Sequence, residues 1–207
     1  MDGTVVNSLA VTTRIWTEWA HERGVDPAAL LPVVHGVQAM DTIRRFAPPG
    51  VDVEREAAEL SRREIAAVEG IVEVPGAGRL LASVPADRWA IVTSAPRALA
   101  LGRLGAARLP IPRVLIGAED APHGKPAPDP YLAAAQALGV AIGECLVWED
   151  APAGIASAEA AGAAVMVITA THPEPPPSVH PHRRDFVGLQ VAVLPDGRLR
   201  LEPPGSD

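Results

Sequence analysis

The sequence is poor in several residue types, and each scarcity narrows what the protein can be. Its 207 residues include one cysteine, Cys145, which has no partner for an internal disulfide and so indicates a reducing compartment. No apolar run approaches the length that crosses a bilayer, and the first residues lack the basic start and apolar stretch of a signal peptide. We therefore expect a soluble cytoplasmic protein with no membrane partner, which we take to be a monomer.

Aromatic residues and lysine are also scarce. Aromatics make up only 3% of the chain, so aliphatic side chains must fill the core. The net charge of −7 disfavours nonspecific binding to nucleic acid. Lys125 is the only lysine among 18 Lys and Arg residues, and it lies between Gly124 and Pro126. A single retained ammonium suggests a site that needs a compact point charge, although a lone lysine in such a loop is often only solvated.

Two regions of the chain differ in their hydrophobic pattern. Between residues 9 and 76, apolar residues recur at helical spacing between Gly and Pro breakers, which predicts a small helical domain. Residues 1–8 and 77–207 form the second region, where short apolar runs alternate with helical stretches. This alternation predicts an α/β core with a Rossmann-like parallel sheet. The four runs cover residues 88–94, 113–117, 144–148 and 164–169, and a terminal hairpin is expected at 191–201.

Polar side chains gather where the predicted strands end. Thr93 and Ser94 close the first run, and Glu149 and Asp150 follow the third. Lys125 follows the second run by a short loop, and Asp2 would also lie at a strand end if a strand preceded it. Ligands of parallel α/β sheets bind beyond the carboxyl ends of the strands. The sequence therefore predicts that these groups converge on one edge of the sheet.

The chemistry of these groups is that of phosphoryl transfer. The adjacent carboxylates Glu149 and Asp150 suit Mg²⁺, although an acidic residue here also favours the start of the next helix, and the two interpretations are compatible. Thr93 and Ser94 offer hydroxyls and free backbone N–H groups to an anion, or else form an ordinary helix cap. Lys125 would add positive charge to the same anion. A cation, a lysine, hydroxyls and a helix N-terminus around one point favour a phosphate substrate.

Four segments resemble the four motifs of the haloacid dehalogenase superfamily, in order and at suitable spacing. They are Asp2-Gly3-Thr4, Thr93-Ser94, Lys125-Pro126 and Glu149-Asp150-Ala151-Pro152-Ala153-Gly154. The helical region between the first two matches that superfamily's small helical cap. Residues 73–77, 89–94 and 124–126 are similar to its sugar and polyol phosphatase branch. The resemblance implies a Mg²⁺-dependent phosphatase for small phosphorylated sugars or polyols, such as 2-deoxyglucose 6-phosphate or glycerol phosphate.

The resemblance also implies a role for each motif residue. Asp2 would be the general acid/base, and its backbone carbonyl would bind Mg²⁺. Thr93 would hydrogen-bond the transferring phosphoryl group, with Ser94 beside it, and Lys125 would pair with that group and the nucleophile. Glu149 and Asp150 would hold the metal.

The helical region would select the substrate. His35 and Gln38 are the residues expected to meet the sugar or polyol, although a lone histidine is more often structural. Relatives often carry Arg after the His-Gly pair, where this chain has Val37-Gln38. The remaining histidines are expected at the surface, with only His123 near the site; the surface set is His21, His172, His180 and His182.

One departure from the superfamily concerns the nucleophile. The first motif has a second aspartate that forms an aspartyl phosphate, and it would lie just before Met1, on a strand that is also missing. A start codon assigned too late explains this better than a natural loss of activity. We expect residues 1–207 alone to have no useful turnover and to be less stable than a longer form.

Related activities remain to be weighed. A haloalkanoate dehalogenase would lack Asp2, and a phosphonoacetaldehyde hydrolase would need a lysine in the helical region, which has none. A β-phosphoglucomutase-like phosphotransferase shares all four motifs and stays open. A non-catalytic protein that only binds phosphate and Mg²⁺ also stays open.

Overall fold

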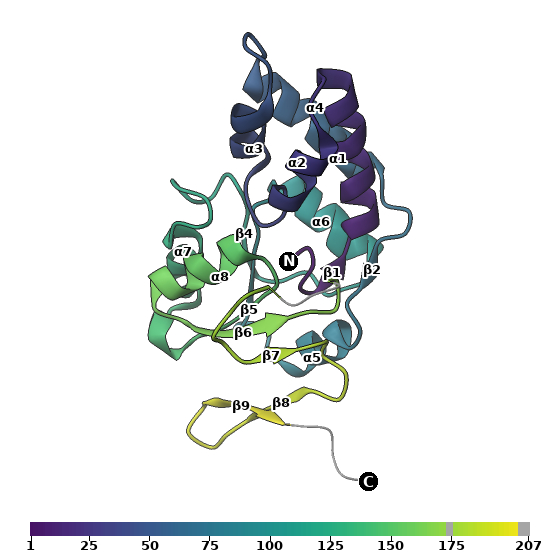
Figure 1. Ribbon diagram of the computed structural model, residues 1–207. Helices are drawn as coiled ribbons and strands as arrows, with labels where there is room; N and C mark the ends of the chain where they lie inside the picture. The colour runs from purple at the N-terminus through teal and green to yellow at the C-terminus, as the bar shows by residue number, and fades with distance from the viewer. Residues whose placement is uncertain (173–175, 203–207) are drawn as a thin grey trace.

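A helical bundle forms one end of the molecule, above the strands in Figure 1. The computed structural model describes residues 1–172 and 176–202; residues 173–175 and 203–207, which belong to the expected α/β core, lie outside the described residues. Residues 9–66 contain no strand, but the stretch 9–76 predicted to be helical also contains the strand β2 (Val72–Glu73). The bundle consists of α1 (Leu9–Arg23), α2 (Pro27–Leu30), the 3₁₀ turn η1 (Leu31–Val33), α3 (Ala39–Phe46) and α4 (Val53–Ala66).

Local signals account for the ends of the bundle helices. Asp26 and Asp52 accept hydrogen bonds from the first turns of α2 and α4, which satisfies backbone N–H groups that have no partner inside the helix. Gly24 ends α1 in the left-handed conformation, which only glycine adopts at little cost. These caps explain why the helix boundaries could be read from the sequence.

The parallel strands follow the four predicted apolar runs, but they form two separate sheets. The first sheet pairs β3 (Ala90–Val92) with β4 (Val114–Ile116). The second has the order β5 (Leu146–Glu149), β6 (Ala164–Ile168), β7 (His182–Arg183), and β7 was not predicted. Within residues 1–172 and 176–202, no strand joins β3 to β5. The fold is α/β, as expected, with its parallel ladder divided.

Helices alternate with these strands. α6 (Arg97–Ala106) follows β3, α7 (Asp129–Leu138) follows β4, and α8 (Pro152–Ala161) follows β5. A short helix that was not predicted, α5 (Ala77–Ser83), precedes β3. The predicted run 144–148 begins too early, because residues 142–144 form a 3₁₀ turn, η2 (Ile142–Glu144). In Figure 1, α6 lies below α1 of the helical bundle.

Two short strands connect the bundle to the rest of the chain. β1 (Val6–Asn7) and β2 (Val72–Glu73) pair in antiparallel fashion, so the chain leaves and re-enters the α/β part at one place. Two-residue strands give no periodic signal, and neither was predicted. The predicted terminal hairpin is confirmed as β8 (Gln190–Val193) and β9 (Leu199–Glu202).

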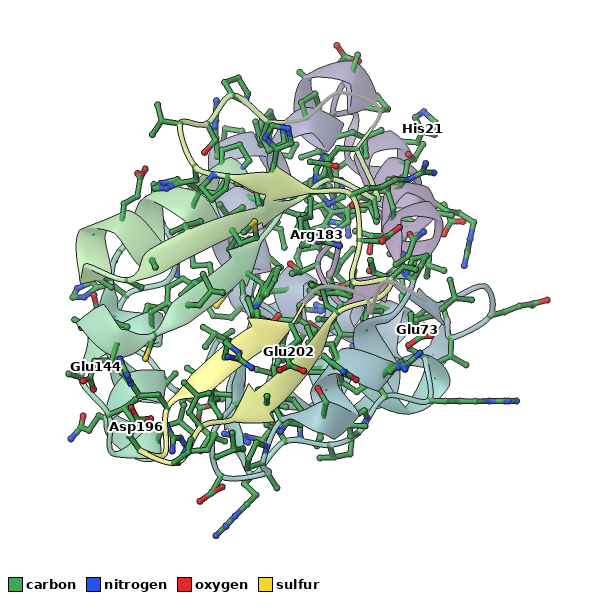
Figure 2. The ribbon with its side chains drawn as sticks, turned by 90° about the horizontal axis from the view of Figure 1, so that it is seen from below. His21, Glu73, Glu144, Arg183, Asp196 and Glu202 are labelled. Atoms are coloured by element: carbon green, nitrogen blue, oxygen red, sulfur yellow. The ribbon has the colours of Figure 1, made fainter. Side chains whose placement is uncertain are left out.

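The apolar core crosses the boundary between the bundle and the strands. Its most buried side chains include Ile15 and Trp19 from α1, Leu60 from α4 and Leu104 from α6. His21 and Glu144 lie at the periphery (Figure 2), whereas a few charged side chains are buried: Glu64, Arg103, Lys125, Glu149 and Asp150. Among the described residues, no helix is both long and apolar enough to span a membrane.

Candidate active site

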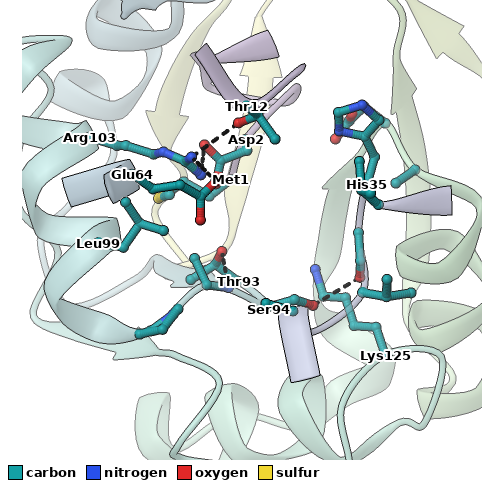
Figure 3. A pocket seen from close by; sticks show the side chains of 18 of the residues that line it. Met1, Asp2, Thr12, His35, Glu64, Thr93, Ser94, Leu99, Arg103 and Lys125 are labelled. Atoms are coloured by element: carbon teal, nitrogen blue, oxygen red, sulfur yellow. Dashed lines mark hydrogen bonds and ion pairs between the residues drawn. The ribbon is translucent and has the colours of Figure 1, made fainter. Parts of the chain in front are cut away.

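A pocket lies between the helical bundle and the ends of the parallel strands. It is a cavity of about 90 Å³. Seven of the eight predicted site residues line it, and Figure 3 shows most of them pointing inward from both sides. The seven are Asp2, His35, Thr93, Ser94, Lys125, Glu149 and Asp150. The convergence that the strand ends predict is therefore present in the structure.

Lys125 forms a buried ion pair on the strand side of the pocket. Its Nζ donates to Glu149 Oε1 at 2.5 Å and reaches the carbonyl oxygen of Val92 at 3.4 Å. Tyr131, on α7, donates its hydroxyl to the same Glu149 oxygen at 2.7 Å, and its ring centroid lies 4.9 Å from Lys125 Nζ. Lys125 is only 5% exposed, so the single lysine is a structured buried charge rather than a solvated one.

Glu149 has a hydrogen-bond donor for each of its lone pairs. Its second oxygen accepts the backbone N–H groups of Asp150 and Ala151 at 2.9 and 3.2 Å. Burial alone would raise the pKa of Glu149, but the charge of Lys125, the α-amino group of Met1 and the hydrogen bonds from Lys125 and Tyr131 hold it well below its usual range. The carboxylate is therefore ionised at neutral pH.

Two glycines of the motifs make room for the carboxylates. A Cβ on Gly154 would collide with the Glu149 carboxylate, and a Cβ on Gly3 would collide with that of Asp150. Gly3 also has φ +76°, which disfavours other residues. The turn residues of these motifs thus permit close approach as well as tight bends.

Asp150 is fixed by two neighbours from other parts of the chain. Thr4 donates its hydroxyl to Asp150 Oδ1 at 2.7 Å, and His172 Nε2 lies 3.0 Å from Oδ2. This hydrogen bond raises the pKa of His172, against the effect of burial. The expectation that His172 lies at the surface is wrong, because Thr171 and the end of β6 bring it to the site.

Asp2 lies on the bundle side of the pocket and is held by one oxygen. Its Oδ1 accepts from Ser8 Oγ at 2.6 Å and from Arg103 Nη1 at 2.9 Å. Arg103, on α6, also donates Nη2 to Glu64 of α4 at 2.8 Å and to Thr12 of α1 at 3.1 Å. One guanidinium therefore joins Asp2 to two helices of the bundle.

Glu64 and Arg103 are both buried, and burial acts on their pKa values in opposite directions. Burial raises the pKa of Glu64, and the charge of Arg103 opposes this without cancelling it. Burial would lower the pKa of Arg103, but Asp2 and Glu64 raise it above its usual value. Arg103 Nε is buried without a hydrogen-bond partner among the described residues.

Thr93 and Ser94 lie at the end of β3, but the helix start beside them is less open than predicted. The N–H of Ala95 donates to Thr93 Oγ1, and the N–H of Arg97 donates to the carboxylate of Glu119 at 2.9 and 3.2 Å. The expectation of free N–H groups is therefore wrong at these two positions. Thr93, 6% exposed, remains at the pocket wall.

A loop of the bundle closes the pocket from above. Ser94 Oγ donates to the carbonyl of Gly36 at 2.9 Å, and Gln38 Nε2 donates to the carbonyl of Ala118 at 3.1 Å. His35 lines the pocket between these contacts, and burial lowers the pKa of its imidazole, against the charge of Asp150. Gln38 is not among the lining residues. The structure brings His35 to the cavity and uses Gln38 as a bridge to the loop before Lys125.

Several residues of the site were missed from sequence. Tyr131 carried a signal, since it is the only tyrosine and lies six residues after the only lysine. Arg103 and Glu64 carried none, because arginine and glutamate are common in this chain. Thr4 was quoted within its motif but given no role.

The carboxylates differ in their capacity to hold a metal ion. Among residues 1–172 and 176–202, no three His, Cys, Asp or Glu side chains are grouped as a metal site. The oxygens of Asp150 contact one hydroxyl and one imidazole, whereas Glu149 already has four donors. Mg²⁺ takes one or two carboxylates and completes its shell with water and substrate oxygens. The residues present fit such an ion bound through Asp150.

Comparison with known proteins gives consistent matches. The family model for haloacid dehalogenase-like hydrolases matches residues 1–162. The chain is 42% identical to hexitol phosphatase A of Escherichia coli (strain K12), with 100% of this chain and 94% of that protein covered. It is 33% identical to glycerol-1-phosphate phosphohydrolase 1 of Saccharomyces cerevisiae, covering 83% and 73% of the two chains.

A solved structure shares the fold. CbbY from Rhodobacter sphaeroides, crystallised with phosphate, superposes with a TM-score of 0.75 at 21% identity, covering 90% of this chain and 92% of that one. At this identity the likeness supports the fold alone. It agrees with the α/β architecture and the helical bundle described above.

Proposed function

The chain belongs to the haloacid dehalogenase-like hydrolases, and from that premise we propose that it hydrolyses phosphate monoesters of small sugars or polyols. Phosphoric monoester hydrolysis follows from the family and its phosphatase relatives. The sugar or polyol as leaving group is supported by the named substrates of the hexitol and glycerol phosphatases. One observation carries the proposal: Lys125, Thr93, Asp2 and Asp150 surround a single cavity.

We propose that the strand side of the pocket binds the phosphoryl group. Lys125 supplies positive charge, and its ion pair with Glu149 keeps the ammonium at one position. Thr93 contributes a hydroxyl from the wall of the same cavity. Because phosphoryl transfer depends mainly on positioning and charge neutralisation, a rigid cation and a fixed hydroxyl suit this step.

We assign proton transfer to Asp2. Its Oδ1 is held by Ser8 and Arg103, while Oδ2 has no hydrogen-bond partner among the described residues. A carboxyl group with one fixed and one available oxygen can, in its protonated form, give its proton to the departing alcohol, and the carboxylate that remains can then accept a proton from the attacking water. General acid/base catalysis of this kind contributes ~10²–10⁴-fold.

We propose that Mg²⁺ binds through Asp150 and the backbone carbonyl of Asp2. When bound, the ion would neutralise charge on the phosphoryl oxygens. Thr4 and His172 orient the Asp150 carboxylate for this role, and Glu149 acts through Lys125. The placement agrees with the oxygen ligands that Mg²⁺ prefers.

We propose that the nucleophile is an aspartate directly before Met1, as the first motif implies, and that residues 1–207 alone lack useful turnover. Met1 is buried and lines the cavity, so a preceding residue would enter the site. We further propose that residues 9–76 act as the cap that selects the leaving group, with His35 at its inner face. The protein would work as a cytoplasmic monomer.

The test is phosphate release from a panel of sugar and polyol phosphates with Mg²⁺. Two forms are compared: residues 1–207, and a longer form that includes the codons upstream of Met1. We expect turnover by the longer form only, without a bisphosphate activator. Turnover by residues 1–207 that is lost on Asp2→Ala would contradict the assignment of the nucleophile. Tight phosphate binding without turnover in either form would refute the proposed phosphatase activity.

A further inference from the structure

We propose that Arg103 is a positioning residue for Asp2, and that Glu64 and Thr12 of the helical bundle hold Arg103 in the geometry that this requires. The inference rests on the proposed function, because it gives Asp2 a role in proton transfer. The four motifs do not contain this contact. The orientation of Asp2 would depend on Arg103 of α6, which lies outside the motifs, and on the position of the helical bundle.

The contact between Arg103 and Asp2 fixes one carboxylate oxygen. Arg103 Nη1 and Ser8 Oγ both donate to Asp2 Oδ1, at 2.9 and 2.6 Å. Two donors at one oxygen restrict rotation of the carboxylate and direct the other oxygen away from them. Figure 3 shows Asp2 and Arg103 together on one wall, across the pocket from His35. An acid/base group needs this kind of fixed direction toward the substrate.

Arg103 in turn depends on the bundle. A long arginine side chain loses rotamer freedom when it is fixed, so it needs several partners to hold it. Its only hydrogen bonds are made by the two terminal nitrogens, since Nε has no partner within the described residues. Nη2 donates to Glu64 at 2.8 Å and to Thr12 at 3.1 Å. Glu64 and Thr12 therefore accept two of the three hydrogen bonds that the Arg103 side chain makes to described residues, and both lie on helices of the bundle.

The size of the cavity makes this dependence relevant to turnover. Pockets that bind small molecules usually enclose about 300–1,000 Å³, and the present cavity is about 90 Å³. A phosphorylated sugar or polyol therefore requires the bundle to move outward. Among the described residues, the backbone passes between the bundle and the α/β part only at the adjacent strands β1 and β2. These strands are therefore the place for a hinge. Each outward movement would withdraw Glu64 and Thr12 from Arg103. Asp2 would be correctly directed only when the bundle closes again.

Helix α4 offers a matched pair of glutamates for the test. Glu64 reaches across to Arg103, whereas Glu56 pairs with Arg23 of α1 at 2.5 Å, inside the bundle. Glu64→Gln and Glu56→Gln each remove a carboxylate charge from the same helix. A purely structural role predicts similar effects of the two changes on the enzyme, whereas a positioning role predicts that only Glu64→Gln lowers kcat.

Kinetics are measured on whichever of the two forms described above turns over. We expect kcat to fall about 10–100-fold in Arg103→Met and about 10-fold in Glu64→Gln, with KM within about threefold, since only the acid/base step is impaired. Glu56→Gln should keep kcat within about twofold. An unchanged kcat in Arg103→Met, or an equal loss in Glu56→Gln, would overturn the inference.

A second measurement does not need activity. Asp2→Asn and Glu64→Gln are combined in a double-mutant cycle on chemical unfolding of residues 1–207, and the cycle is repeated with Arg103→Met. We expect the coupling between the two sites to change when Arg103 is replaced, because Arg103 contacts both. The same coupling in both backgrounds would refute the link. If neither form turns over, the proposed function fails, and this cycle alone decides whether Arg103 connects the bundle to Asp2.

Discussion

Two buried glutamates lie on opposite sides of the pocket, and their pKa values are shifted in opposite directions. Glu149 is 3% exposed and Glu64 is 6% exposed, so burial alone cannot explain the difference. Glu149 receives a lysine, a tyrosine hydroxyl and two backbone N–H groups, and its pKa is lowered. Glu64 shares one arginine with Asp2, and its pKa is raised. The charges nearby decide the direction of each pKa shift: Lys125 and the α-amino group of Met1 outweigh burial at Glu149, whereas at Glu64 the charge of Asp2 adds to burial and Arg103 does not cancel them.

The comparison separates a rigid side of the pocket from an adjustable one. All partners of Glu149 come from the α/β part, on β5, α7 and the loop after β4. The partners of Arg103 come from both parts, so its hydrogen bonds depend on how the bundle is docked. A fixed phosphate cradle combined with a movable acid/base side is suited to an enzyme that must admit its substrate.

The largest expected effect follows from removal of Lys125. Lys125→Met leaves Glu149 buried without its counter-charge, which typically costs about 3–5 kcal/mol of stability. The variant should also lose turnover in the form that has it, because we propose that Lys125 supplies positive charge to the phosphoryl group. Guanidinium unfolding and phosphate release measure the two effects.

A double variant is the control for this prediction. Lys125→Met combined with Glu149→Gln removes both charges and should recover much of the lost stability. If the double variant is as unstable as the single one, the ion pair is not the reason for the loss, and the rigid side of the pocket would need another explanation.

Asp2→Asn tests the adjustable side. The amide keeps the size of the side chain but cannot transfer a proton, so kcat should fall ~10²–10⁴-fold. Stability should also fall, since the buried Arg103 would keep only Glu64 as a carboxylate partner. Asp41→Asn, on the exposed face of α3, is the matched control and should leave kcat unchanged. A normal kcat in Asp2→Asn would contradict the assignment of Asp2 as the general acid/base.

The pH dependence of stability should differ between the two glutamates. The pKa of Glu149 is lower in the folded state than its ordinary 4.5, so its contribution is complete above that pH and is lost as the pH falls through the folded pKa. The pKa of Glu64 is raised, so its contribution is complete at low pH and is lost as the pH rises through the folded pKa.

Unfolding free energies from about pH 2 to pH 7 measure both slopes, because the pKa of Glu149 is lowered to about 2. Relative to wild type, Glu64→Gln should gain stability as the pH rises. The double variant lacking Lys125 and Glu149 should lose less stability than wild type as the pH falls. Parallel curves for all three proteins would show that the opposite pKa shifts have been wrongly assigned.

The smallest expected effect concerns Tyr131. Tyr131→Phe removes one of four donors from an ionised carboxylate and should cost about 1–2 kcal/mol, because the lysine and both N–H groups remain. Thr17→Val removes a hydroxyl bonded only to the carbonyl of Thr13 in its own helix, and it should cost much less. Thermal unfolding compares the two. Equal costs would mean that the hydroxyl of Tyr131 adds nothing specific to the rigid side.

Much of the architecture was predictable because its signals are local. The helical spacing with its Gly and Pro breakers gave α1, α3 and α4, and the four apolar runs gave β3 to β6. β1, β2 and β7 were missed because two residues carry no period. The division of the parallel strands into two sheets also had no local signal, since strand pairing joins residues far apart in the chain.

The sequence by itself determined that Thr93, Lys125 and Asp150 meet in one pocket, because parallel strands bring their carboxyl ends to one edge. Asp2 was expected there only if a strand preceded it. Only the tertiary structure decided what each of them contacts. Arg103 and Glu64 are 39 residues apart, and they meet because α6 packs beside α4. Ion pairs of this kind depend on how whole elements dock, and no periodicity along the chain records the docking. The candidate catalytic residues could be predicted from the sequence, whereas the hydrogen bonds and ion pairs that orient them could not.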